Sequence, residues 1–542
     1  MRRYALPLLF LASCASAQGA GERLDIAPSA FTSVHATLLD FDLDGSLVTD
    51  TDDPAAIRMQ IEAQLLFTTG QLNGEHSVGR LGQLELSAIR ATPIPVPPPP
   101  APEPAPPAPA PAPAPSFAVT YHAKLPVAWG ATSLPASYSF TLPARLSQTG
   151  QLAFVTKYGP TCVDPAGGTV GAGTVFLFYR PRQTGCVLAA EDVATFDAKV
   201  TASAENTNGK SPEYHRVWAD SALEVVAMFS HEYATPTVGD EGVRAYDDFV
   251  WLVHQYLGSL QPNESKRSEP SGLSPSGTAA PQVRLAAELP DGRTIAINVM
   301  LTGHALTDDG AALDAWYGAV TPKADVILYN GHAGLGANVR TLMEKGSFVS
   351  GQYLIWFPNG CDTFAYVDRT LADRRARLNP DDPGGTKYMD TLSNVMAGYF
   401  NALVPTSLTL IHALVDARDV SRAPKTYEQI FANVDPSQIV VVTGEEDNLL
   451  QPLPPAPNRA GEPGRQGQAS QAAQAAPGDL GTDGDPQGGP ASAAGAQKKT
   501  SDSGCSLGGG ARDAGSGSGA LALVLAVLTL SLRRRRRSVM AR

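Results

Sequence analysis

Residues 324–368 read ADVILYNGHAGLGANVRTLMEKGSFVSGQYLIWFPNGCDTFAYVD and contain two short apolar runs separated by a helical pattern. The runs, at 326–329 and 353–357, are bounded by Gly and Pro and rich in β-branched and aromatic residues, which is typical of buried parallel strands. The helical pattern, at 338–345, is closed by a glycine. The stretch therefore predicts a strand–helix–strand unit.

The two predicted strands end alike, the first in Asn-Gly-His and the second in Asn-Gly-Cys, with His332 and Cys361 separated by 361 − 332 = 29 residues. A right-handed crossover brings the carboxyl ends of parallel strands to one edge of the sheet, where open α/β sheets place their ligands. An imidazole beside a thiol stabilises the thiolate. We therefore expect His332 and Cys361 to share one rim as a Cys–His pair.

The chain contains 5 Cys, and four of them have another assignment. Cys162 and Cys186 flank a strand-rich segment and are expected to close a disulfide loop. Cys14 lies in an apolar leader, and Cys505 precedes a C-terminal apolar run. Cys361 is left without a partner. In an exported protein such a cysteine is either buried and inert or kept for its reactivity.

Length and charge limit the classes of function. A chain of 542 residues is long enough for two or three domains. A net charge of −12 and a pI of about 5.3 argue against nucleic acid or an anionic membrane surface as the main partner.

The first residues resemble a secretory leader, with two Arg, a short apolar core and small residues. Two cleavage sites remain open. Leu11–Cys14 resembles a bacterial lipobox, which implies a lipid on Cys14, whereas the small residues before Gln18 fit ordinary cleavage after residue 17.

The C-terminal end combines Cys505, a Gly/Ser spacer, an apolar run at 520–532 and an Arg cluster at 533–537. The apolar run is shorter than the roughly 20 residues of an ordinary spanning helix, and Arg clusters mark the cytoplasmic side. The combination resembles the MYXO-CTERM sorting tail. The resemblance implies processing near Cys505 and display on the cell surface or outer membrane of a Gram-negative bacterium. A plain tail anchor is the alternative.

The sequence predicts a multidomain protein, with an N-terminal mostly-β, sandwich-like domain and a C-terminal α/β domain with a mainly parallel sheet. The expected segments are a signal peptide (1–17), an N-terminal β segment (31–91), a Pro-rich linker or insertion (93–115), a β-rich domain with helices (117–260), a linker (262–281), the α/β domain (282–448), a disordered stalk (452–504) and the sorting or anchor segment (505–542).

Within these segments, alternation at 57–67 and 81–89 predicts a hairpin, and repeated short alternating runs over 117–199 predict a sandwich. We expect helices at 221–229, 247–257, 311–320, 370–377 and 391–403, a hairpin at 282–301, and strands at 408–414 and 439–442.

The α/β domain resembles the caspase, gingipain and legumain group of cysteine peptidases, in motif order and spacing over residues 282–448. In that group the catalytic His follows one strand in a His-Gly motif and the catalytic Cys follows the next parallel strand. The matching residues are His332 in VILYNGHAGLG and Cys361 in YLIWFPNGCDT. The resemblance implies a protein or peptide substrate. Ala333 departs from it, because the family has a Gly whose amide helps to form the oxyanion hole, and a Cβ restricts φ.

The residues suggest individual roles. Cys361 attacks a carbonyl carbon, and His332 holds the thiolate and protonates the leaving amine. Amides of Cys361 and of residues 331–333 are expected to stabilise the oxyanion, while Gly331 and Gly360 permit sharp turns. His304, in a second Gly-His-Ala sequence, is a substrate contact, a replacement base or a simple loop histidine.

Asp40, Asp42 and Asp44 match the first half of a calcium loop, although a Thr replaces the bidentate Glu. The same stretch resembles the nucleophile motif of haloacid-dehalogenase-type phosphatases, but a polar turn between strands is favoured. We expect no other cofactor. The alternative to a peptidase is a non-catalytic cell-surface binding or structural module with a pseudo-peptidase α/β domain.

Overall fold

The structure is a computed structural model. It describes residues 36–95, 116–165, 170–205, 208–235, 239–260, 267–269, 277, 279–419, 421–445, 448 and 450–457. The leader with Cys14 and the tail with Cys505, for which the sequence makes predictions, lie outside the described residues. Most of the Pro-rich segment, most of the 262–281 linker and most of the stalk also lie outside them.

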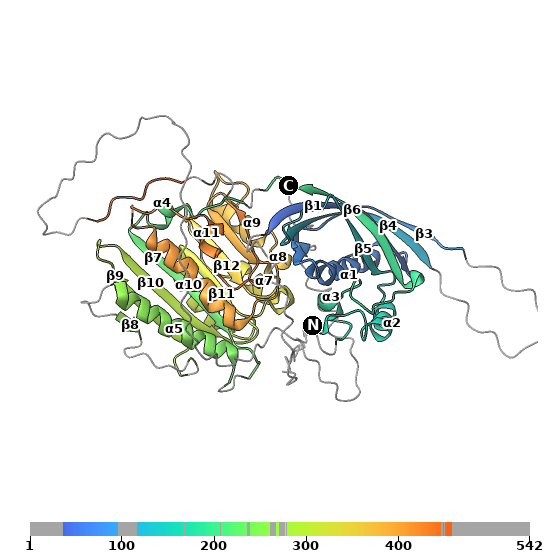
Figure 1. The fold of residues 1–542 in the computed structure, drawn as a ribbon, viewed down its shortest axis with the longest axis horizontal. Helices are drawn as coiled ribbons and strands as arrows, with labels where there is room; N and C mark the ends of the chain where they lie inside the picture. The colour runs from blue at the N-terminus through green and yellow to red at the C-terminus, as the bar shows by residue number, and fades with distance from the viewer. Residues whose placement is uncertain are drawn as a thin grey trace, which may run out of the picture.

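The N-terminal domain, residues 36–205, is one curled antiparallel sheet that wraps around a long helix, α1 (Pro54–Asn73) (Figure 1). The strand order is β2-β4-β1-β6-β5, with β3 paired to β4. The strands are β1 (Thr37–Thr49), β2 (Ser77–Gly79), β3 (Glu85–Pro93), β4 (Phe117–Trp129), β5 (Ser137–Pro143) and β6 (Val193–Ala202); the short helices are α2 (Gln148–Tyr158) and α3 (Val175–Phe178). The domain is therefore mostly β, but it is not a sandwich of two sheets.

The predicted strand at 57–67 is wrong, because these residues lie in α1. Asp53 caps this helix by accepting hydrogen bonds from the amides of Ala55 and Ala56, and Pro54 occupies the first turn. Nearly all of the helix after Ile57 is buried, so its sequence lacks the one-sided periodicity of a surface helix.

The Pro-rich segment connects two neighbouring antiparallel strands of this sheet. Pro93 of β3 pairs with Phe117 of β4, and the Ile94 amide donates to the Ser116 carbonyl. Since β1 also pairs with both β4 and β6, the predicted β segments on either side of the Pro-rich residues form a single sheet. The segment is thus an insertion within one domain.

The C-terminal domain, residues 208–457, is built on a mixed eight-stranded sheet of order β14-β13-β12-β11-β7-β10-β9-β8. The five central strands, β10, β7, β11, β12 and β13, are parallel to one another. The outer strands β8, β9 and β14 run antiparallel to their neighbours. The strands are β7 (Ala222–Ser230), β8 (Arg267–Glu269), β9 (Gln282–Glu288), β10 (Thr294–Thr302), β11 (Val326–Asn330), β12 (Leu354–Asn359), β13 (Met389–Asn394) and β14 (Val440–Gly444).

Helices cover both faces of this sheet (Figure 1). One core contains residues of α4 (Tyr214–Val217), α5 (Glu241–Leu260), α10 (Phe400–Asp416) and α11 (Tyr427–Phe431). The opposite core contains residues of α6 (Gly310–Val320), α7 (Ala337–Glu344) and α9 (Thr370–Leu378). Burial on both faces explains why the central strands are continuous apolar runs. No helix within the described ranges has the length and apolar character needed to cross a bilayer.

Three predictions of secondary structure in this domain are wrong. The stretch 221–229 is the central strand β7 rather than a helix, so the sheet begins well before residue 282. The stretch 408–414 lies inside helix α10, and 391–403 is divided between β13 and the start of α10. Short apolar runs that are buried all round do not distinguish a strand from a helix by periodicity.

The organising unit itself is confirmed. β11 and β12 are parallel, and α7 lies between them in the chain. The antiparallel pair β9–β10, helices α6 and α9, and strand β14 also lie where the sequence predicts them.

Candidate active site

The carboxyl ends of β11 and β12 are in register. Asn330 is paired with Asn359, and the Gly331 amide donates to the Asn359 carbonyl. His332 and Cys361 each lie two residues beyond this pair, so both follow the same edge of the sheet, as the sequence predicts. The short element α8 (Thr363–Tyr366) begins directly after the Cys361 turn.

Gly331 and Gly360 allow these two turns to touch. A Cβ at Gly360 would lie 2.3 Å from the Gly331 carbonyl oxygen and 3.5 Å from the Ala333 amide nitrogen. A Cβ at Gly331 would lie 2.0 Å from the Ser230 hydroxyl oxygen. Neither glycine has a positive φ. Both glycines are therefore required for the close approach of these turns to their neighbours.

Buried amides fix the register at this edge. The Asn359 side-chain amide donates to Asn330 Oδ1 at 2.9 Å and to the Leu403 carbonyl at 3.2 Å. Asn394, at the end of β13, donates to Asn359 Oδ1 at 2.9 Å, and Ser407 donates to Asn330 Oδ1 at 2.7 Å. Three neighbouring strands thus end in Asn residues that form one network, which makes the edge rigid.

His332 is held on three sides. Its amide donates to Ser230 Oγ at 3.2 Å, its ring Nε2 lies 3.1 Å from the Glu232 carbonyl oxygen, and its ring packs edge-on against Phe400 at 5.3 Å. A carbonyl oxygen only accepts, so Nε2 carries the proton and the lone pair of the neutral ring is on Nδ1. The side chain is 9% exposed.

His304 lies beside His332, with ring centres 4.5 Å apart, and its Nδ1 donates to the same Glu232 carbonyl at 2.9 Å. Burial, and then the neighbouring His304, lower the pKa of His332 to about 4, although the hydrogen bond to Glu232 opposes this. His332 is consequently a neutral imidazole near pH 7. The structure thus brings His304 and His332 together at this edge of the sheet.

Cys361 is half-buried, and its Sγ lies 3.6 Å from the Gly398 carbonyl oxygen, the acceptor for the thiol. Burial raises the pKa of Tyr329, hydrogen bonds with Ser230 and Asn338 oppose this, and the charges of Asp309 and Cys361 add to the increase. The same Tyr329 donates its hydroxyl to the His332 carbonyl at 2.7 Å. The sulfur is therefore within electrostatic range of a side chain that contacts the His332 turn.

Two amides remain for an oxyanion. The amides of Gly331 and His332 are occupied by Asn359 and Ser230. The amides of Ala333 and Cys361 lie on the two touching turns, and neither donates a hydrogen bond within the part of the chain that the structure describes. This pair could bind an oxygen that acquires negative charge.

Asp362 precedes α8 but its side chain does not cap this helix. It adopts left-handed backbone angles (φ 48, ψ 32), and its side chain makes no cap hydrogen bond. Its Oδ1 instead accepts from Asn73 Nδ2 at 3.1 Å, and Asn73 is the last residue of α1 in the N-terminal domain.

The structure places the remaining predicted residues away from this edge. Cys162 and Cys186 form the expected disulfide, in the connection between α2 and β6. Asp40, Asp42 and Asp44 lie in the middle of strand β1 rather than in a loop, with Asp42 and Asp44 beside the His122 ring. Among the described residues, no group of three or more His, Cys, Asp or Glu side chains is arranged to hold a metal ion.

Sequence reasoning missed the residues that support the pair. Ser230 is the last residue of β7, which the sequence suggested was a helix, and the Glu232 carbonyl follows this strand. Gly398 lies between β13 and α10, and Phe400 is the first residue of α10. The run ALEVVAMFS, which ends with Ser230, was a usable signal, because it is short and rich in Val and other apolar residues.

Comparison of the chain with family models, with curated proteins and with solved structures gives no match. The chemistry of the His332 and Cys361 turns is therefore the basis on which a function is assigned.

Proposed function

We propose that the protein is a cysteine peptidase of the caspase, gingipain and legumain type, with Cys361 as nucleophile and His332 as base and acid. The observation that carries the proposal is the paired register of Asn330 and Asn359, because it starts the His332 and Cys361 turns from the same point on two adjacent parallel strands. The contact of Gly360 with the backbone of Gly331 then holds the turns together.

The site has the parts that acyl transfer needs. The thiol proton of Cys361 passes to Nδ1 of His332 as Sγ attacks the substrate carbonyl carbon, and the carbonyl oxygen becomes an oxyanion that accepts from the amides of Ala333 and Cys361. His332 then gives its proton to the leaving amine as the C–N bond breaks. A water molecule, deprotonated by His332, attacks the resulting thioester and releases the acid and the thiol.

The departure at Ala333 does not count against this chemistry. Ala333 has φ −65 and ψ −22, which any L-residue adopts without strain. Its amide can therefore serve in an oxyanion hole as a glycine amide would.

The proposal extends to location. The leader and the Cys505 tail suggest an exported enzyme held on the bacterial envelope, with processing near Cys505 and protein or peptide as substrate. Cleavage at the lipobox would put a lipid on Cys14, and ordinary cleavage after residue 17 would remove that cysteine. Mass spectrometry of the mature ends tests this part. Recovery from the envelope of a chain that keeps its Arg tail would contradict processing at Cys505.

The alternative, a non-catalytic surface module, is favoured by one observation. His332 is only 9% exposed, so little of its side chain is open to a substrate. In a scaffold of this kind the histidine would be a structural residue.

A peptide library with varied side chains before the cleaved bond distinguishes the two functions. The peptidase predicts cleavage by the wild type, abolished by Cys361→Ala and reduced about 10²–10⁴-fold by His332→Ala. His122→Ala is the matched control, because that histidine lies on the N-terminal sheet beside Asp44. Cleavage that persists in Cys361→Ala would rule out Cys361 as the nucleophile, and absence of cleavage from every preparation would support the scaffold.

A further inference from the structure

The two domains share a hydrophobic core beside Cys361. Residues of the N-terminal domain contribute Ala36, Leu38, Val78 and Ala128, and the C-terminal domain contributes Phe364, Ala365, Val395, Ile439 and Val441, all almost fully buried. Phe364 and Ala365 belong to α8, which starts two residues after Cys361. The N-terminal domain therefore packs directly against the element that carries the proposed nucleophile.

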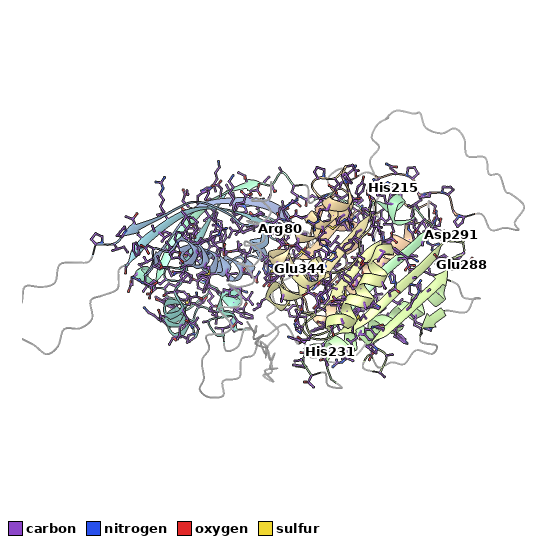
Figure 2. The ribbon with its side chains drawn as sticks, turned by 180° about the vertical axis from the view of Figure 1, so that it is seen from behind. Arg80, His215, His231, Glu288, Asp291 and Glu344 are labelled. Carbon is purple, nitrogen blue, oxygen red and sulfur yellow. A yellow bond between two sulfur atoms is a disulfide. The ribbon has the colours of Figure 1, made fainter. Side chains whose placement is uncertain are left out.

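Arg80 strengthens this junction (Figure 2). Its guanidinium lies 4.5 Å above the ring of Phe364, donates to Thr443 Oγ1 at 2.8 Å and pairs with Glu205 at 3.3 Å. Arg80 is 3% exposed, so these contacts are made in a largely dehydrated environment, where they are stronger than at the surface.

The Cys361 turn is strained, and the N-terminal domain holds the strained residue. Asp362 has a left-handed backbone, which costs energy for any residue with a Cβ and persists only where neighbours enforce it. Within the C-terminal domain the Asp362 amide donates to the Met396 carbonyl at 3.1 Å. From the N-terminal domain Asn73 Nδ2 donates to Asp362 Oδ1 at 3.1 Å and to the Ser77 carbonyl at 3.1 Å. Both partners are buried, Asn73 at 8% and Asp362 at 8% exposure.

The His332 turn is held in the same manner. Leu335, three residues after His332, also has a left-handed backbone, with φ 51. Its side chain packs against the hydrophobic core of the N-terminal domain, which includes residues of α1. Each of the two turns thus contains one strained residue with a Cβ, and each strained residue is anchored to the same domain.

We propose that the N-terminal domain is a constituent part of the active site, in which Asn73 is a positioning residue for Cys361. It sets the backbone of Asp362 and thereby the direction of the adjacent thiol, while the packing of Leu335 sets the His332 turn. This inference rests on the proposed function. It predicts that the β domain is not an independent binding module attached to a self-sufficient enzyme.

We call the hydrogen bond from Asn73 Nδ2 to Asp362 Oδ1 the brace. Substitutions at Asp362 test this brace while leaving Asn73 in place. Asp362→Asn keeps an Oδ1 acceptor and tolerates left-handed angles; Asp362→Gly loses the acceptor but adopts those angles freely; Asp362→Ala loses both advantages. Asn73→Ala removes the donor. In the full chain we would measure amide hydrogen exchange over residues 361–366 and the alkylation rate of Cys361 by iodoacetamide, with and without His332→Ala.

The brace predicts that Asn73→Ala and Asp362→Ala speed exchange over 361–366 about tenfold and abolish most of the His332-dependent part of alkylation. Asp362→Asn should behave like the wild type, and Asp362→Gly should lie between. If Asn73→Ala does not fold, the Asp362 series decides alone.

Unchanged exchange in Asp362→Ala would overturn the inference, whatever the alkylation rates. A different result would separate the proposed function from the brace. In that result, hydrogen exchange follows the predicted order, but the alkylation rate of Cys361 does not depend on His332 in any variant. In that case the brace stands and Cys361 is not the nucleophile of a peptidase.

Discussion

The imidazoles of His304 and His332 donate to one backbone oxygen, the carbonyl of Glu232, with their ring centres 4.5 Å apart. One carbonyl has two lone pairs, so it can serve both rings when each is neutral. Two protonated rings at this separation would repel each other. The arrangement therefore fixes the tautomer of His332 and disfavours its protonated form.

This relationship predicts the acid limb of the pH–rate profile. The pKa of His332 is lowered from 6.5 to about 4, so the neutral base is present above about pH 4 and activity is lost only as the pH falls through that value. His304→Ala removes a neighbouring charge, so the limb should move to higher pH. The measurement is kcat/KM against pH, with circular dichroism to confirm folding. An acid limb near pH 6.5 in the wild type, with no change of position in His304→Ala, would contradict this prediction.

The contact between the two turns predicts an intolerance of any side chain at Gly360. Gly360→Ala places a Cβ against the Gly331 carbonyl, so we expect a loss of about 1–3 kcal/mol in unfolding free energy and a large loss of activity. Gly318→Ala in α6 is the control, because its new Cβ would meet only Ser347 Oγ at 3.6 Å. Urea denaturation measures both. Equal stability of the two variants would show that the turns do not touch.

The network of buried Asn side chains at Asn330, Asn359 and Asn394 predicts that Asn359→Asp, a nearly isosteric change, strongly lowers the stability of the protein. In Asn359→Asp the group that donates to Asn330 and Leu403 becomes an acceptor facing two acceptors in a buried site. We expect destabilisation of about 3 kcal/mol, and a smaller loss for Asn359→Leu, which buries no charge. Thermal unfolding compares the two variants. A fully stable Asn359→Asp protein would remove the network from the account of this edge.

Asp362 predicts a pH dependence of stability. Burial raises the pKa of Asp362 to about 6, although the hydrogen bond from Asn73 and the charge of Arg180 lower it. The folded state then holds a proton that the unfolded chain has released, so stability falls as pH rises from about 4 to about 6, by about 3 kcal/mol. Asp362→Asn lacks this decline. Denaturation at pH 4, 5, 6 and 7 tests it, and parallel curves for the two proteins would refute the shifted pKa.

The parallel pair β11 and β12 could be predicted because both strands are buried on two faces and read as apolar runs with Gly at their ends. Helix α1 could not, although Asp53 and Pro54 mark its start, because burial on all sides hides its periodicity. The strand β7 was missed for the related reason that a short apolar run suits either element.

Within the site, the sequence predicted His332, Cys361 and His304, because side-chain chemistry and motif spacing are local properties. It could not predict the Glu232 carbonyl, since a backbone oxygen has no sequence signal. Nor could it predict the bond between Asn73 and Asp362, which joins residues 289 positions apart and depends on how two domains pack.

The most direct test of the central claim is the rate at which iodoacetamide alkylates Cys361 at pH 7 in the wild type and in His332→Ala. If the imidazole serves the thiol, His332→Ala slows alkylation by about tenfold or more, whereas His122→Ala leaves it unchanged. Equal rates in the wild type and His332→Ala would contradict the account, because the two turns would then meet without any exchange of protons between their side chains.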